Sequence, residues 1–467
     1  MAGGAVRRRD YHRGMSSSGA GTLPEEPAAP LWRRFVVFLG PLVLTNVLQA
    51  LSGTFNSVFL GQMLGPQALA AAVAFFPVLM FFFAFVIGLG TGASVLVGQA
   101  WGAQRLERVQ EIAGAVLLGG ALLGVLVAVV GLLAVPGLLR WLGTPPEIVL
   151  DAVAYARVML LALPVLFVSM LAAALLRGLG DTVTPLGVLL VTCATSFVLT
   201  PVLITAGLGV ASAAWATFAA TALALAWLAW RLQRRAHLLA PRALRPSLRW
   251  RPDVLRAVAR LGVPTGLFFV TGSLADLGLL TLVNRHGASA VAAWGAVQQV
   301  TAYVQFPAFS IAIAASVFAA QAIGAGHHRQ VHEATRVGLA LNVVLTGSIA
   351  VLVAWLAPQA VRLFTRDPAV VDLGAQLLRI SVWGSLLLGI GSVFSGVMRA
   401  AGTVRVPMLI SLGCLLLLQY PVGWLIDRTL GVQVLWSTYL VTYGCGAALQ
   451  ASYYFGVWRR QPIRRLA

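Results

Sequence analysis

The chain of 467 residues contains no lysine and only 14 acidic residues. A P-loop needs a lysine to hold the nucleotide phosphates, so this absence excludes a pump that hydrolyses ATP through that motif. The only three cysteines, Cys193, Cys414 and Cys445, lie singly in apolar segments. They support neither a disulfide framework nor a zinc site. We therefore expect no enzyme activity, no cofactor and no metal ion held by the chain.

Apolar side chains are abundant. Hydrophobic residues make up 59% of the chain and charged residues 10%, and the mean hydropathy is +0.88. These values are typical of a polytopic membrane protein. All 33 basic residues are arginine and contribute to a formal net charge of +19. Because they lie between apolar stretches and not along one face, we expect them to orient the protein in a membrane and not to bind nucleic acid.

Twelve apolar stretches are long enough to cross ~30 Å of hydrocarbon as helices that rise about 1.5 Å per residue. They are continuously apolar and lack the alternating pattern of a membrane β-barrel. The fold class predicted is an all-α membrane protein. The predicted spans are 35–60, 70–98, 110–135, 152–175, 184–206, 209–232, 258–284, 290–320, 333–356, 373–397, 406–426 and 433–457.

The chain also matches itself when it is displaced by 222 positions. One register fits several separate groups of residues, which indicates two copies of a unit of six spans. Because six is even, both copies enter the membrane from the same side and form parallel repeats, two six-helix bundles. Such an arrangement favours a transporter with its site between the halves. The matching pairs include Gly65 and Gly287, Gln99 and Gln321, Arg157 and Arg379, Arg177 and Arg399, and Pro185 and Pro407.

The arginines define the expected orientation. When the amino terminus is placed in the cytoplasm, 26 arginines fall on that side and 7 on the other. This bias predicts that both termini are cytoplasmic, and we expect a bacterial inner membrane. The predicted domains are a disordered tail at 1–30, a bundle at 31–235, a cytoplasmic linker at 236–253, a second bundle at 254–458 and a tail at 459–467.

Asp276 is the clearest acidic residue inside a span, because it precedes the largely apolar run 277–283. A carboxylate at this depth is costly, and its default interpretation is functional. Protonation relieves that cost, which suits the residue to carrying a proton or holding a cation. The alternative is a structural aspartate that is hydrogen-bonded into a helix interface. We predict that Asp276 is the ion-coupling residue.

Polar side chains form three clusters, in the first, eighth and twelfth spans. They either line a cavity or hold helices together. Their positions in the spans that begin or end a unit favour a cavity. The candidates for a substrate cavity are Asn46, Gln49, Asn56, Gln298, Gln299, Tyr303, Tyr439 and Tyr443.

Five segments are distinctive in their order and positions: Gly61–Ala71, Gly98–Ala103, Leu176–Pro185, Gln321–Gly326 and Met398–Pro407. Together they resemble the multidrug and toxic compound extrusion (MATE) family, over about 33–458. The resemblance implies two bundles of six helices with a V-shaped central cavity, and export of organic cations in exchange for protons or sodium ions. Many prokaryotic members have a buried aspartate where this chain has Asn56, and often have Asn and Asp where it has Ser196 and Thr200.

Two other transporter classes and a receptor or scaffold are alternatives. A major-facilitator carrier also has twelve spans in two parallel units, but the loop at 102–108 fits its signature poorly. A lipid-linked flippase commonly has fourteen spans and a basic cavity. A receptor or scaffold would leave the duplication unexplained. The expected partners are small-molecule substrates and the lipid bilayer, without an obligatory protein partner.

Overall fold

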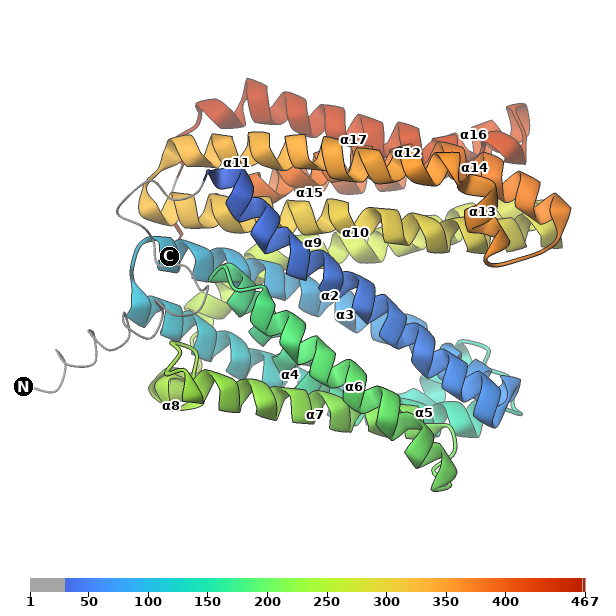
Figure 1. Ribbon diagram of the computed structural model, residues 1–467, viewed down its shortest axis with the longest axis horizontal. Coiled ribbons are helices and arrows are strands. Elements are labelled where there is room, and N and C mark those ends of the chain that lie inside the picture. The colour runs from blue at the N-terminus through green and yellow to red at the C-terminus, as the bar shows by residue number, and fades with distance from the viewer. Residues whose placement is uncertain (1–29, 464, 467) are drawn as a thin grey trace, which may run out of the picture. The chain divides into compact units, whose positions relative to one another are not determined.

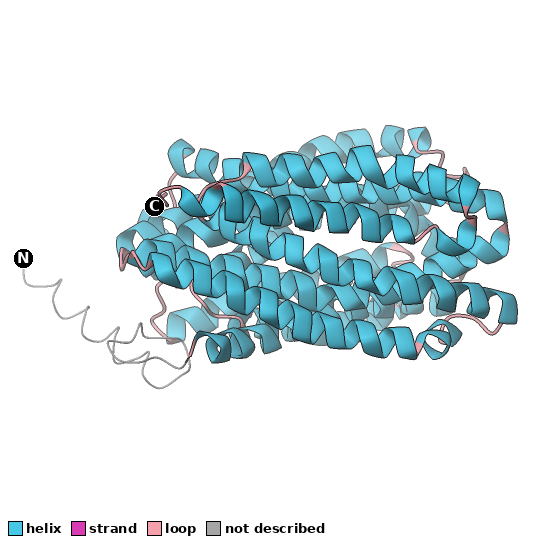
Figure 2. Cartoon of the chain, turned by 90° about the horizontal axis from the view of Figure 1, so that it is seen from above, coloured by secondary structure: helices cyan, strands magenta, loops and turns pink. Residues whose placement is uncertain are grey.

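The computed structural model describes residues 30–463, 465 and 466. All regular elements of this part of the chain are helical, and it contains no strand (Figures 1 and 2). The prediction of an all-α fold is therefore confirmed. Apart from residue 30, the tail that we expected to be disordered lies outside the described residues.

The first half of the described chain contains six long helices. Glycine and proline mark several of their ends, and Pro66 begins a helix where its missing N–H has no partner to lose. The helices are α2 (Leu31–Phe59), continued by the π-helix η1 (Leu60–Leu64), α3 (Pro66–Gly102), α4 (Leu106–Trp141), α5 (Val149–Gly178), α6 (Val183–Thr205) and α7 (Ala211–Arg234), followed by the short α8 (Pro241–Leu244) and the 3-10 helix η2 (Arg245–Ser247).

The second half repeats this order with more interruptions. Two of its long helices contain a π-helical segment. The elements are α9 (Pro252–Val283), η3 (Asn284–His286), α10 (Ala288–Ala325), α11 (His328–Leu341), the π-helix η4 (Asn342–Thr346), α12 (Gly347–Trp355), α13 (Ala357–Arg362), α14 (Pro368–Ala400), α15 (Arg405–Cys414), the π-helix η5 (Leu415–Gln419), α16 (Tyr420–Thr429), η6 (Val432–Val434), α17 (Ser437–Gly456) and η7 (Trp458–Arg460).

Eleven helices among the described residues are long and apolar enough to cross a membrane. The twelfth predicted span corresponds to α17, which has 20 residues and is therefore long enough. It is less apolar than the other eleven helices. Its polar positions include Thr438, Thr442 and Gln450, which are buried inside the protein. A helix that turns its polar side chains toward protein does not need the hydropathy of a lipid-facing helix.

The described chain forms two compact units. The first unit comprises residues 40–262, and the second comprises residues 263–466 with the start of α2 at 30–39. In the first unit α4 and α5 approach so closely that a Cβ atom at Gly124 would lie 2.5 Å from Cα of Pro164. Glycine permits this approach, as is usual for helices packed in a membrane.

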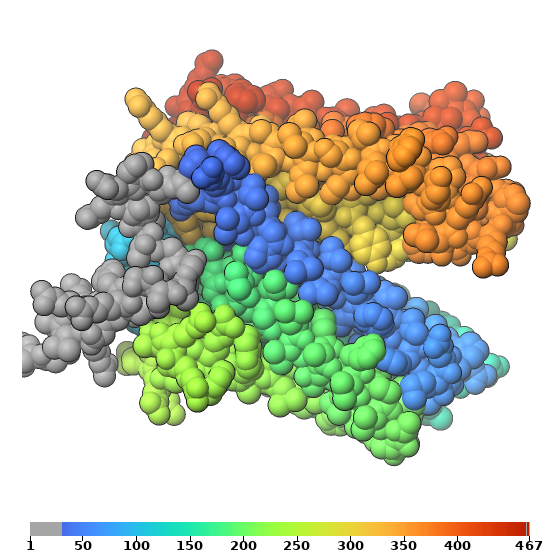
Figure 3. Space-filling model, viewed as in Figure 1, coloured from blue at the N-terminus to red at the C-terminus, as the bar shows by residue number. Residues whose placement is uncertain are grey.

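The second unit is built around α10 and α14, which pack along one another. Its core is aliphatic and alanine-rich and also includes Trp294 and Trp436. The start of α2 belongs here because Phe35 stacks on Phe318 with 4.6 Å between the ring centroids. The side chains of α12, α13 and the beginning of α14 form a continuous surface, shown in orange in Figure 3.

The backbone bears out the duplication. Gly65 and Gly287 precede corresponding helices with φ of 91° and 86°, a conformation that L side chains rarely adopt. The segment from Pro41 to Gly65 is one residue longer than that from Pro264 to Gly287. The π-helix η1 lies in the longer segment, and a π-helix is the usual way for a helix to accommodate one inserted residue.

The segment at 236–253, predicted to be the linker, packs against α4. Gln110 Nε2 donates to the carbonyl oxygen of Leu238 at 3.2 Å, and Arg251 forms an ion pair with Glu111 at 2.7 Å. A Cβ atom at Gly114 would lie 2.2 Å from the carbonyl oxygen of Ser247. The linker is therefore held to the first unit by backbone contacts as well as by charge.

Candidate functional site

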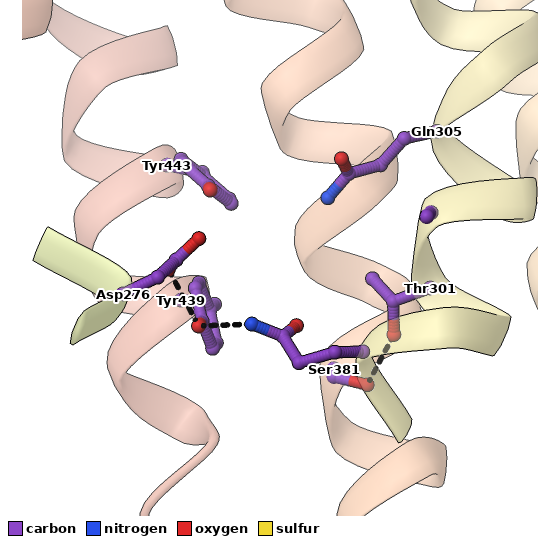
Figure 4. A pocket seen from close by; sticks show the side chains of 8 residues that line it. Asp276, Thr301, Gln305, Ser381, Tyr439 and Tyr443 are labelled. Carbon is purple, nitrogen blue, oxygen red and sulfur yellow. Dashed lines mark hydrogen bonds between the residues drawn. The ribbon is translucent and has the colours of Figure 1, made fainter. Parts of the chain in front are cut away.

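A cavity of about 210 Å³ lies within the second unit. Four of its helices contribute side chains: α9, α10, α14 and α17. Asp276, Tyr439 and Tyr443 approach the cavity from one side (Figure 4). Thr301, Gln305 and Ser381 approach it from the other. The lining residues are Asp276, Gln298, Thr301, Ala302, Gln305, Ser381, Tyr439 and Tyr443.

Helical spacing explains why these residues meet. On α10 the lining positions begin at Gln298 and follow three, four and seven residues later, so they share one face of the helix. Tyr439 and Tyr443 are four residues apart on α17. Each helix thus presents one stripe to the cavity, and Asp276 adds the only carboxylate among the lining residues.

Asp276 accepts two hydrogen bonds through the same oxygen atom. Tyr439 Oη donates to Asp276 Oδ1 at 2.8 Å, and Gln419 Nε2 donates to it at 3.0 Å. Gln298 Nε2 in turn donates to Tyr439 Oη at 3.2 Å. The carboxylate is therefore held by neutral donors from η5 and α17. Within the described chain no cationic side chain forms a salt bridge with it.

Tyr439 and Tyr443 line the cavity next to the carboxylate, and the core residues Trp294 and Trp436 pack near Tyr439 without lining it. Trp294 lies 4.9 Å from Trp436 and 6.5 Å from Tyr439, measured between ring centroids. Tyr439 lies 5.8 Å from Tyr443. Packed rings of this kind offer rigid faces that attract cations, in addition to the area they bury.

The opposite wall carries hydroxyl and amide groups. Thr301 Oγ1 and Ser381 Oγ are 3.3 Å apart and hydrogen-bonded, and Gln305 points its amide into the cavity (Figure 4). Thr301, Ala302, Gln305 and Ser381 are absent from the predicted set. The spacing of three and seven residues from Gln298 could have indicated Thr301 and Gln305, whereas nothing in the sequence singles out Ser381.

Two predicted residues of α10 do not line the cavity. Gln299 is exposed on another face of the helix, because adjacent helical residues point about 100° apart. Tyr303 is half-buried and packs edge-on against Phe306, with 5.7 Å between centroids. Their closeness in sequence to Gln298 does not make them part of the same face.

The three predicted residues of α2 lie in the first unit. Gln49 is exposed and Asn46 is half-buried. Asn56 Oδ1 accepts hydrogen bonds from Ser196 Oγ and Thr200 Oγ1, each at 3.3 Å. The structure thus joins the three positions at which the family resemblance leads one to expect two aspartates and an asparagine, and here no member of the group is acidic.

Comparisons with known proteins agree with this architecture. A family model described as MatE matches residues 41–202 and again 264–425. The chain is 35% identical to the "Probable multidrug resistance protein YoeA" of Bacillus subtilis (strain 168), over 93% of this chain and 96% of the relative. It is 27% identical to the "Probable multidrug resistance protein YpnP" of the same organism, over 92% and 96%.

Among solved structures, an outward-facing multidrug resistance MATE family transporter of the MOP superfamily has a TM-score of 0.84 and 24% identity, over 92% of this chain and 95% of that chain. At this identity the likeness establishes the fold alone. The double match to the family model covers well over half of the chain and excludes the major-facilitator alternative. The chain belongs to the MATE family of membrane transporters.

Proposed function

We propose that this protein is a secondary active antiporter that exports organic cations or other xenobiotics in exchange for protons or sodium ions. The observation that carries the proposal is the Asp276 carboxylate at a cavity, without a cationic partner among the described residues. A carboxylate in surroundings of low dielectric constant is stabilised by a bound proton or cation. The names of the relatives as multidrug resistance proteins support the xenobiotic substrate class.

The same carboxylate provides a reason for exchange. Asp276 can neutralise one cation at a time, so a coupling ion and a cationic substrate compete for it. Tyr439 and Tyr443 present ring faces near the carboxylate, and such faces favour organic cations. None of the lining residues is basic, which argues against the flippase alternative with its anionic lipid-linked substrate.

We further propose that the carrier lies in a bacterial inner membrane with both termini in the cytoplasm. The support is the distribution of 26 arginines on one side and 7 on the other. The mechanism needs no cofactor besides the coupling ion, and no protein partner.

The proposal is tested with the full-length protein in liposomes loaded with ethidium. A proton gradient and a sodium gradient are imposed separately, and ethidium movement is followed by fluorescence. We expect one of the two gradients to drive ethidium against its own gradient, and an ethidium gradient to move that ion in the opposite direction. Ethidium movement that is indifferent to both gradients would refute ion-coupled exchange.

A further inference from the structure

Gln419, which lies outside the cavity lining, ends the π-helix η5 that separates α15 from α16. The corresponding helix of the first unit, α6, is α-helical throughout Val183–Thr205. Such turns occur frequently at functional sites. The π-helical turn therefore gives the second unit a local geometry that α6 of the first unit lacks.

The Gln419 side chain is fully buried, with a relative exposure of 0%. Its Nε2 atom donates to Asp276 Oδ1 at 3.0 Å, while its Oε1 atom is buried and has no hydrogen-bond partner among the described residues. A buried carbonyl without a hydrogen-bond partner destabilises the folded protein. That cost, together with the bond to Asp276, is more readily explained by a role at the carboxylate than by stabilisation of the fold.

The packing beside Gln419 holds it in place. A Cβ atom at Gly278 would lie 3.1 Å from the Tyr420 ring, and one at Gly423 would lie 2.5 Å from Leu279 Cδ2. On α9 these contacts follow Asp276 by two or three residues, and on α16 they follow Gln419 by one to four residues. The two helices therefore meet closely, and the amide has little freedom to leave the carboxylate.

The first unit has a neutral counterpart of this contact. Its helices α2 and α6 are joined by Asn56 with Ser196 and Thr200, none of which titrates. In the second unit the corresponding pair, α9 and α16 with η5, is joined by Asp276 and Gln419. In the first unit two hydroxyl groups donate to an amide oxygen, whereas in the second unit an amide donates to a carboxylate. Only the contact of the second unit contains an ionisable group.

We propose that Gln419 is the positioning residue of the ion-coupling carboxylate: its amide stabilises ionised Asp276 and sets the pH at which the carboxyl group takes up a proton. An ionised carboxylate only accepts hydrogen bonds, and a bond to a charged acceptor is about twice as strong as one to a neutral acceptor. The inference rests on the proposed role of Asp276 for its functional meaning.

Few titratable groups face this carboxylate. Among the described residues they are Tyr439 and Tyr443 on α17 and, on α16, Tyr420, which packs against α9 at Gly278. The cavity residues of α10 and α14 are neutral: Gln298, Thr301, Ala302, Gln305 and Ser381. His286 in η3, which follows α9, and Asp427 near the end of α16 are 2.5 Å apart and bond to one another and not to Asp276. Neutral hydrogen-bond donors therefore dominate the local control of protonation, and Gln419 is one of the two that reach Asp276 directly.

The test measures protonation without transport. Infrared difference spectra of the full-length protein in liposomes follow the C=O band of protonated carboxyl groups through a pH titration, and D276N identifies the band of Asp276. Gln419→Met removes the amide and keeps the size of the side chain. We expect the midpoint of this band to rise by about one pH unit, because a hydrogen bond to a charged group is lost.

The chain offers a matched control. Gln450 on α17 is also buried, its Nε2 donates to Ser411 Oγ at 2.9 Å, and its Oε1 likewise has no partner among the described residues. Gln450→Met should leave the midpoint unchanged. Should Gln419→Met give poorly folded protein, Gln419→Asn keeps the amide but withdraws it by one methylene, and it should shift the midpoint in the same direction.

An unchanged midpoint in the Gln419 variants, or the same shift in Gln450→Met, would overturn the inference, as would the absence of any titrating band that D276N removes. A different measurement, ethidium exchange by liposomes that contain D276N, tests the proposed function. If D276N liposomes still exchange ethidium for the coupling ion, antiport through Asp276 is wrong, whereas the band position still reports whether Gln419 controls the carboxyl group.

Discussion

Tyr439 Oη lies 2.8 Å from Asp276 Oδ1 and joins α17 to α9 at the wall of the cavity. The same hydroxyl accepts a hydrogen bond from Gln298 on α10. A bond between a neutral donor and a charged acceptor contributes about 1.5–3 kcal/mol. Tyr439 therefore connects the predicted coupling residue to two further helices of the second unit.

Removal of this hydroxyl should impair ion coupling. In Tyr439→Phe the carboxylate loses one of two donors and Gln298 Nε2 loses its acceptor, so we expect ion-driven ethidium efflux to fall about tenfold. Tyr443→Phe is the matched control, because the Tyr443 hydroxyl has no hydrogen bond among the described residues. Equal losses in both variants would show that ring packing, and not the bond to Asp276, is what matters.

The neutral cluster of the first unit should contribute to stability and not to coupling. Asn56→Ala removes the acceptor for Ser196 and Thr200, and we expect a loss of about 1 kcal/mol in the free energy of unfolding. The pH dependence of ethidium efflux should stay that of the wild type, because no titrating group is removed. A displaced pH profile in this variant would place part of the coupling in the first unit.

The linker should loosen as the pH falls. Burial lowers the pKa of His237, and Arg235 acts in the same direction while Asp181 opposes it; the neutral ring accepts from the Leu239 N–H at 3.1 Å. A lowered pKa means that stability is present above the ordinary value of about 6.5 and is lost below it, as protonation charges a buried ring.

Hydrogen exchange of 236–250, corrected for the intrinsic rate, measures this effect at pH 7.5 and at pH 5.5. His237→Asn keeps an acceptor for Leu239 but does not titrate, so its protection should be the same at the two pH values. A wild-type linker equally protected at both would contradict the prediction.

The orientation is tested by labelling in a background without the three native cysteines. Arg245→Cys in the linker and Arg366→Cys in the loop before α14 are both exposed positions. A membrane-impermeant maleimide added to intact cells should label Arg366→Cys alone, and Arg245→Cys should react only after lysis. Labelling of Arg245→Cys in intact cells would reverse the proposed topology.

The fold was largely predictable because membrane helices are specified by length and hydropathy, and because pairs such as Gly65 and Gly287 mark the same turn in each repeat. The interruptions were not predictable. The η5 segment begins with four consecutive leucines, and a run of identical apolar residues carries no periodicity from which a π-helical turn could be inferred. Gln419 therefore appeared only as an isolated polar residue in an apolar span.

At the cavity, the residue types that are rare in a membrane were the informative ones. Asp276 is conspicuous because a carboxylate inside a membrane span is energetically costly and usually has a function. Thr301 and Ser381 did not, since single hydroxyl groups are common in membrane helices and often bond to their own backbone. Gln299 is the sequence neighbour of Gln298 and a member of the same polar cluster, but its helical position turns it away from the cavity.

The central claim is that Asp276 couples the ion gradient to substrate export, and Asp276→Asn tests it most directly. This change keeps the size of the side chain and removes the titrating group. Efflux of ethidium from liposomes is measured under the gradient that drives the wild type, with membrane insertion and ethidium binding verified for the variant. We expect gradient-driven efflux to be abolished while the protein remains folded. Efflux at the wild-type rate would show that Asp276 is structural and that coupling resides elsewhere.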